Sequence, residues 1–102
     1  KLSQEGHKVI TAIDAYNAIQ SARREKPDLI ILDVMLPAGG GYHTLKNIRL
    51  TPFGSQTPIV ILTGMHDEEL RQKIEMEGVE AYLQKPVDYE VLSETVKKLL
   101  LT

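Results

Sequence analysis

Residues 27–41, which read PDLIILDVMLPAGGG, decide the fold of this 102-residue chain. The apolar residues 29–32 do not alternate with polar ones, which predicts a strand covered on both faces, as in a parallel sheet. Asp33 closes this strand with a carboxylate, and the glycines that follow at positions 39–41 predict a loop. The stretch therefore predicts a buried parallel strand whose carboxyl end carries a polar side chain.

Similar apolar segments lie on both sides of this strand. Residues 7–12 (HKVITA), 59–62 (IVIL) and 81–83 (AYL) predict three further strands. Amphipathic segments predict four helices: one from Asp14 that ends before Pro27, one at residues 42–49, one at residues 67–77 that stops at Gly78, and one capped by Asp88. Loops are expected at residues 37–41 and 51–58. The expected apolar stripe of the last helix is Val91, Leu92, Val96, Leu99 and Leu100.

The composition limits the classes of function. A formal net charge of -2 gives no electrostatic case for nucleic acid or anionic lipid as the main partner. The absence of cysteine excludes disulfides, Cys-type zinc sites and thiol nucleophiles, and it fits a cytoplasmic location. The apolar runs are far shorter than the roughly 20 residues of a membrane span, so we expect no membrane contact. The length indicates one domain, residues 1–102.

Strands and helices alternate four times in this interpretation. Such alternation predicts an α/β fold with an open, doubly wound parallel sheet. Ligands of such sheets bind beyond the carboxyl ends of the strands. Three predicted strands end there in Asp33, Thr63 and Lys85, so a carboxylate, a hydroxyl and an amine should meet at one edge.

These three groups suit phosphoryl chemistry. A carboxylate can attack phosphorus and form an acyl phosphate, provided that cations offset the repulsion between its charge and the phosphoryl oxygens. Lys85 offers such a charge, and the hydroxyl of Thr63 can donate a hydrogen bond to a phosphoryl oxygen. Gly64, beside Thr63, leaves space for the incoming group.

The stretches PDLIILDVMLPAGGG, IVILTG and AYLQKPVD resemble the three signature stretches of the response-regulator receiver family, which has a chemotaxis-regulator-like, flavodoxin-like fold. Their order and spacing agree over nearly the whole chain, from about Lys8 to Leu101. The resemblance implies a phosphoacceptor signalling domain of a two-component system, not an enzyme beyond self-phosphorylation and autodephosphorylation. It also implies a histidine kinase or a histidine phosphotransfer protein as the phosphodonor.

The resemblance assigns roles to individual residues. Asp33 would be the phospho-acceptor, and it would bind Mg²⁺ together with the backbone carbonyl of Met35. Thr63 would be the switch hydroxyl, Lys85 would contact the phosphoryl group, and Tyr82 would be an aromatic switch.

The resemblance also implies an output surface. The family's helix 4–strand 5–helix 5 face, roughly residues 63–101 here, would bind an output protein, and a homodimer is a further possibility. The family commonly has a cis peptide bond at the position of Pro86, and we expect one here.

One feature departs from the family. Its first strand ends in a pair of acidic residues that hold Mg²⁺, and residues 1–9 (KLSQEGHKV) supply neither that strand nor that pair. We therefore expect an N-terminally incomplete receiver fold, without the first strand and most of helix 1. Because one carboxylate binds Mg²⁺ weakly, we also expect a weak metal site.

The missing strand would leave a gap in the sheet. In the family's strand order, 2-1-3-4-5, the gap falls between residues 7–12 and 29–32. Three outcomes are possible: a neighbouring chain fills the gap, the two strands pair directly, or the domain is only partly stable. The sequence leaves three explanations open: a piece of a longer protein, a naturally shortened receiver, or an oligomer that exchanges segments.

Other classes of function stay open at this point. A pseudo-receiver would bind partners without phosphorylation, as the missing acidic pair suggests. A haloacid-dehalogenase-like phosphatase would normally carry a second Asp two residues after the nucleophile, where this chain has Met35. His7, His43 and His66 are scattered without ligand spacing, and the glycines at 39–41 lack the Lys-Ser/Thr ending of a phosphate loop.

Overall fold

The computed structural model describes residues 7–13, 15–34, 40–52, 56–64 and 68–101. Strands and helices alternate along the chain, as the sequence predicts. The elements are β1 (Val9–Ala12), α1 (Ala15–Glu25), β2 (Leu29–Val34), α2 (Gly40–Arg49), β3 (Ile59–Thr63), α3 (Glu68–Met76), β4 (Ala81–Gln84) and α4 (Tyr89–Leu100). No helix in the described part of the chain is both long and apolar enough to cross a membrane.

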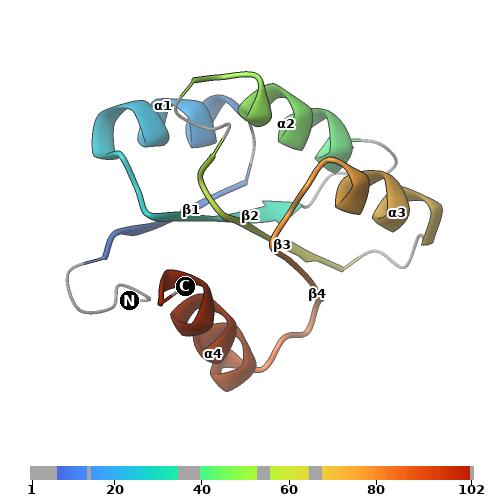
Figure 1. The fold of residues 1–102 in the computed structure, drawn as a ribbon. Helices are drawn as coiled ribbons and strands as arrows, with labels where there is room; N and C mark the ends of the chain where they lie inside the picture. The colour runs from blue at the N-terminus through green and yellow to red at the C-terminus, as the bar shows by residue number, and fades with distance from the viewer. Residues whose placement is uncertain (1–6, 14, 35–39, 53–55, 65–67, 102) are drawn as a thin grey trace.

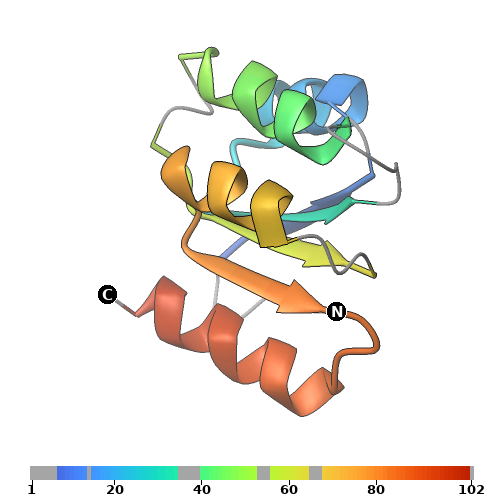
Figure 2. The same ribbon diagram turned by 90° about the vertical axis from the view of Figure 1, so that its right-hand side faces the viewer.

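The strands form one parallel sheet in the order β1-β2-β3-β4. Helices α1, α2 and α3 cover one face of the sheet, and α4 covers the other (Figure 1; Figure 2). The predicted doubly wound parallel sheet is therefore confirmed.

Strands β1 and β2 pair directly. Val9 lies opposite Leu29 and Ala12 lies opposite Leu32, in parallel register. The expected strand order, 2-1-3-4-5, would place a further strand between them, and the observed order differs in this respect. Of the outcomes considered for this region, the structure has direct pairing, which connects β1 to β2 by the backbone hydrogen bonds of a parallel ladder.

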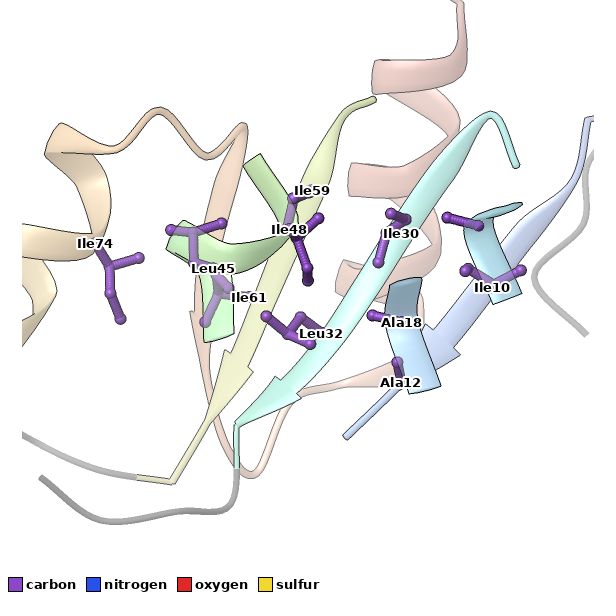
Figure 3. Packing of buried hydrophobic residues seen from close by; sticks show 11 residues of the cluster. Ile10, Ala12, Ala18, Ile30, Leu32, Leu45, Ile48, Ile59, Ile61 and Ile74 are labelled. Atoms are coloured by element: carbon purple, nitrogen blue, oxygen red, sulfur yellow. The ribbon is translucent and has the colours of Figure 1, made fainter. Parts of the chain in front are cut away.

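The core lies on both faces of the two central strands. Residues 29–32 of β2 are each at most 1% exposed, which confirms that both faces of this strand are covered. Because successive side chains of a strand point to opposite faces, Ile30 and Leu32 pack under α1 and α2 (Figure 3). Leu29 and Ile31 pack on the other face, against α4. This packing fixes where β2 ends, and therefore where Asp33 lies.

Local signals explain how several helices begin and end. Asp88 caps α4 as predicted, because its side chain accepts a hydrogen bond of 2.8 Å from the backbone N–H of Glu90. Gly78 has φ +90 just after α3, a conformation that favours glycine. The other predicted cap, Asp14, lies outside the described residues.

Two expectations about the helices were wrong. The predicted loop at residues 37–41 overlaps α2, which begins at Gly40 and not at position 42. A helical glycine costs only about 1 kcal/mol relative to alanine, and burial of Leu45 and Ile48 on the same helix outweighs that cost. Val91 was assigned to the apolar stripe of α4, but it is 49% exposed, because the side of α4 that faces the sheet carries Leu92, Val96, Leu99 and Leu100.

Arg49 closes the amino-terminal edge of the sheet. Its guanidinium donates hydrogen bonds to the carbonyl of Thr57 (2.7 Å) and to the carbonyl of Gly78, and lies 3.4 Å from Glu80 Oε1. The same Glu80 oxygen accepts a hydrogen bond of 2.8 Å from the backbone N–H of Ile59. The end of α2, the start of β3 and the α3–β4 connection are thereby held together.

Candidate functional site

The carboxyl ends of β2, β3 and β4 bring together the three residues that the sequence predicts to meet. Asp33 lies opposite Leu62 in the sheet, one position before Thr63. Lys85 directly follows β4, and its backbone N–H donates a hydrogen bond of 2.7 Å to the carbonyl of Thr63. The parallel register therefore places a carboxylate, a hydroxyl and an ammonium on three neighbouring strand ends.

Asp33 and Lys85 form an ion pair. Lys85 Nζ lies 2.7 Å from Asp33 Oδ1. This oxygen is buried, yet it makes no hydrogen bond within the described part of the chain, so the contact with the ammonium is electrostatic and not a directed hydrogen bond. The side chains of Lys85 and Asp33 are 37% and 22% exposed, so the pair also borders solvent, where a ligand has access.

Thr63 lies at the border between the core and open space. Its side chain is buried, with 2% exposure, whereas the next residue, Gly64, is exposed. A methyl group built onto Gly64 would meet no atom within 4 Å. Open space therefore lies at Gly64, next to Thr63 in the chain.

Tyr82 lies on the same face of the sheet as Thr63. It pairs with Ile61, two positions before Thr63, and packs against the core cluster under α1, α2 and α3. The guanidinium of Arg71, on α3, lies over the Tyr82 ring at 5.2 Å from its centroid, and it also pairs with Glu75 at 3.2 Å. This cation–π contact joins α3 to the predicted aromatic switch.

The sequence interpretation did not find Arg71. Its only local signal is the spacing of four residues to Glu75, which is common on solvated helix faces and says nothing about Tyr82.

The expected cis peptide bond is confirmed, between Lys85 and Pro86.

The described residues do not by themselves make a Mg²⁺ site. The buried oxygen of Asp33 without a hydrogen bond is a suitable ligand atom for a cation. However, the described residues contain no group of three or more His, Cys, Asp or Glu side chains that could hold a metal ion. Mg²⁺ requires near-octahedral oxygen coordination, and the ammonium of Lys85 already contacts the one carboxylate present. The other predicted ligand, the carbonyl of Met35, lies outside the described residues.

Comparison with known proteins identifies the family. The family model of the response regulator receiver domain matches residues 1–97. The chain belongs to this family. Receiver domains are signalling domains of two-component response regulators, and they interact with histidine kinases and with output domains.

Relatives of this receiver domain occur both in longer and in short proteins. It is 36% identical to the transcriptional regulatory protein AfsQ1 of Streptomyces coelicolor over 97% of its own length but only 43% of AfsQ1. It is 30% identical to the protein PilH of Pseudomonas aeruginosa, over 97% of this chain and 82% of PilH. The chain thus spans less than half of AfsQ1 but most of PilH.

Solved structures with the same fold are also receiver proteins. A putative response regulator from Chloroflexus aurantiacus superposes with a TM-score of 0.79 at 24% identity, over 96% of this chain and 100% of that one. The receiver domain of the sensor histidine kinase PA1611 from Pseudomonas aeruginosa, described with a magnesium ion in its active site cleft, gives a TM-score of 0.78 at 22% identity, with the same two coverages. At these identities, the likeness establishes the flavodoxin-like receiver fold.

Proposed function

We propose that Asp33 of this receiver domain accepts a phosphoryl group from a phosphohistidine of a partner, either a histidine kinase or a histidine phosphotransfer protein. The observation that carries the proposal is the 2.7 Å ion pair between Asp33 and Lys85, formed where three strand ends meet. A carboxylate at an edge that is open to solvent is accessible to a donor, and a fixed ammonium beside it can offset the charge of the incoming group.

The proposed reaction is a phosphoryl transfer between two side chains. An oxygen of Asp33 attacks phosphorus, the P–N bond of the phosphohistidine breaks, and the leaving imidazole nitrogen takes up a proton from solvent. The product is an acyl phosphate on Asp33. Lys85 stabilises charge on the phosphoryl oxygens during transfer because its ammonium already lies at this carboxylate.

Metal binding forms a separate part of the proposal. Receiver domains typically bind Mg²⁺. We propose that Asp33 and the backbone carbonyl of Met35 hold the ion weakly in this chain, because the described residues add no further carboxylate at this edge. Dependence of phosphoryl uptake on Mg²⁺ concentration measures this affinity.

The response to phosphorylation is proposed to pass through Thr63 and Tyr82. The hydroxyl of Thr63 would donate to a phosphoryl oxygen, and Tyr82, on the same face of the sheet, would change position with it. The surface formed by α3, β4 and α4 would then change its affinity for an output protein, or for a second copy of the chain. Direct contact with nucleic acid or membrane is not part of the proposal, and we place the domain in the cytoplasm with its kinase.

The organisation of residues 1–102 as one receiver domain without the family's first strand stays a prediction.

A second candidate function is a pseudo-receiver that binds its partner without phosphorylation. The observation that favours it is the single carboxylate that the described residues place beside Lys85. In this case the Asp33–Lys85 pair would be permanent and would act as part of the fold.

One experiment separates the two candidates. The protein and its Asp33→Asn variant are incubated with acetyl phosphate, with and without Mg²⁺, and their intact masses are recorded. The phosphoacceptor proposal expects one added phosphoryl group on the parent protein and none on the variant. A folded parent protein that gains no mass would instead favour the pseudo-receiver.

A further inference from the structure

A groove lies between α4 and the residue that precedes β4, away from the Asp33 edge. It has a volume of about 480 Å³. Two of its lining side chains are aliphatic: Val91, which is 49% exposed, and Leu99, which is partly buried against the core. Thr95 lies between them on α4, and its hydroxyl already donates to the carbonyl of Val91 at 2.8 Å. The apolar part of the groove is therefore aliphatic and accessible.

The charges around this groove are mostly negative. Glu80, Glu90 and Glu94 line it together with one cation, Lys98. Glu80 is already engaged, since its Oε1 accepts from the backbone N–H of Ile59. Glu90 and Glu94 are exposed and have no ion-pair partner among the residues that the structure describes.

The positions of the two free carboxylates distinguish this groove from an ordinary solvated helix face. Glu90 and Glu94 are four residues apart, so they lie on one side of α4, where like charges are mildly destabilising for the helix. Val91, which is 49% exposed, lies beside them on α4 and lines the same groove. A ligand that matches this face carries positive charge beside an aliphatic side chain.

We propose that this acidic groove, formed by Glu80, Glu90, Val91, Glu94, Thr95, Lys98 and Leu99, binds a partner protein through a segment that presents Arg or Lys beside an aliphatic side chain. Charge complementarity sets the choice of partner: Glu90 and Glu94 accept hydrogen bonds from the cations, and the aliphatic side chain covers Val91 and Leu99. The proposal deepens the proposed output role of α4 and rests on it, because it names the chemistry of the partner at that surface.

A fluorescent amphipathic peptide with Arg and Leu on one face is the probe, and fluorescence anisotropy measures its affinity. A second peptide, in which neutral citrulline replaces each Arg, tests whether the cation is recognised. We expect the Arg peptide to bind the parent protein about tenfold more tightly than the citrulline peptide, a difference equivalent to about 1.4 kcal/mol.

Two variants with the same change of net charge locate the binding site. Glu94→Gln removes a carboxylate from the groove, and we expect it to weaken binding of the Arg peptide about fivefold, as expected for one exposed ion pair. Glu25→Gln, at the end of α1, is the matched control, and we expect affinity within twofold of the parent protein.

Three results would overturn the proposal. Equal weakening by the two variants would show general attraction of a cationic peptide to an acidic protein. Equal binding of the citrulline peptide would show that the groove does not select cations. A dimer in sedimentation that Glu94→Gln dissociates would show that a second copy of the chain occupies the groove.

The same binding measurement on Asp33→Asn keeps this proposal separate from the phosphoacceptor proposal. The groove exists in the unphosphorylated structure, so we expect Asp33→Asn to bind the Arg peptide like the parent protein. If the protein takes up no phosphoryl group, the peptide should still bind. If the peptide does not bind, phosphoryl uptake should still occur.

Discussion

The two edges of the sheet use charged side chains in opposite ways. At the amino-terminal edge, Arg49 and Glu80 make hydrogen bonds to the backbone at the start of β3 and in the α3–β4 connection. At the carboxyl-terminal edge, Asp33 and Lys85 contact each other at 2.7 Å, and the buried oxygen of Asp33 makes no hydrogen bond within the described part of the chain. Polar groups of similar kinds therefore fix the structure at one edge and stay available for a ligand at the other.

This difference has an energetic meaning. A buried polar atom without a hydrogen bond costs free energy, and natural structures keep few of them. At Asp33 the ammonium of Lys85 offsets part of this cost, and the remainder is expected where the oxygen has a role in binding or chemistry. The amino-terminal edge is thus expected to contribute stability, whereas the carboxyl-terminal edge is expected to contribute reactivity. The following changes test this division, in decreasing order of their predicted size.

Arg49→Met removes the guanidinium that holds the amino-terminal edge of the sheet together. The side chain is only 13% exposed, and its removal leaves the carbonyls of Thr57 and Gly78 and an oxygen of Glu80 without their charged donor. We expect the free energy of unfolding in urea to fall by about 2–4 kcal/mol, since hydrogen bonds from charged groups contribute about 1.5–3 kcal/mol each and overlap here. The rate of phosphoryl uptake should stay within twofold in the folded protein.

The matched control for this change is Arg24→Met. Arg24 is 69% exposed and, among the described residues, pairs with Glu25 alone, so we expect the free energy of unfolding to change by less than about 0.5 kcal/mol. Equal destabilisation by the two changes would show that the amino-terminal network has no special role.

Lys85→Gln acts at the carboxyl-terminal edge. Loss of the ammonium removes charge stabilisation for the phosphoryl oxygens, and we expect the rate of uptake from acetyl phosphate to fall about 10–100-fold. The free energy of unfolding should change by less than about 1 kcal/mol, because the side chain is 37% exposed. Lys97→Gln, on the exposed side of α4, serves as the control and should change neither quantity. A stability loss as large as that of Arg49→Met would contradict the division between the edges.

Thr63→Val separates acceptance of the phosphoryl group from the response to it. Valine keeps the β-branched shape at this buried position and removes only the hydroxyl, so we expect a loss of about 1 kcal/mol in the free energy of unfolding. Phosphoryl uptake should persist within a few-fold, whereas the shifts of amide signals in β4 on phosphorylation, recorded by NMR, should shrink. Undiminished shifts would exclude Thr63 as the switch.

Arg71→Met should have the smallest effect. It removes the cation over the Tyr82 ring and a half-exposed pair with Glu75, which together are worth about 0.5–1 kcal/mol. We expect a small fall in melting temperature and a change in the ring-proton shifts of Tyr82. Glu75→Gln removes the ion pair alone, so the Tyr82 ring-proton shifts should stay unchanged in that variant. Shifts that change only in Arg71→Met would show that the contact between Arg71 and the Tyr82 ring is responsible.

Most of the fold was predictable because its signals are local. The unbroken apolar runs at residues 29–32 and 59–62 indicate buried parallel strands, and the polar residue at the end of each run indicates the site edge. The convergence of Asp33 and Lys85 then follows from parallel topology, although these residues are distant in sequence.

The features that sequence reasoning missed depend on distant contacts. Arg49 bonds to Gly78, 29 positions away, and no spacing around either residue indicates this contact. Val91 has the apolar character of a core residue, and only the rotation of α4 against the sheet leaves it in the groove. The direct pairing of β1 with β2 was one of several outcomes because strand neighbours are chosen by packing, not by local pattern.

Locating the phosphoryl group on the chain shows directly whether Asp33 is the acceptor. After treatment with acetyl phosphate, sodium borohydride reduces an acyl phosphate of aspartate to homoserine, and tandem mass spectrometry of the proteolytic peptides reads the modified position. We predict homoserine at position 33 and unmodified carboxylates elsewhere. A phosphorylated protein whose homoserine or other reduced residue lies at a different position would contradict it.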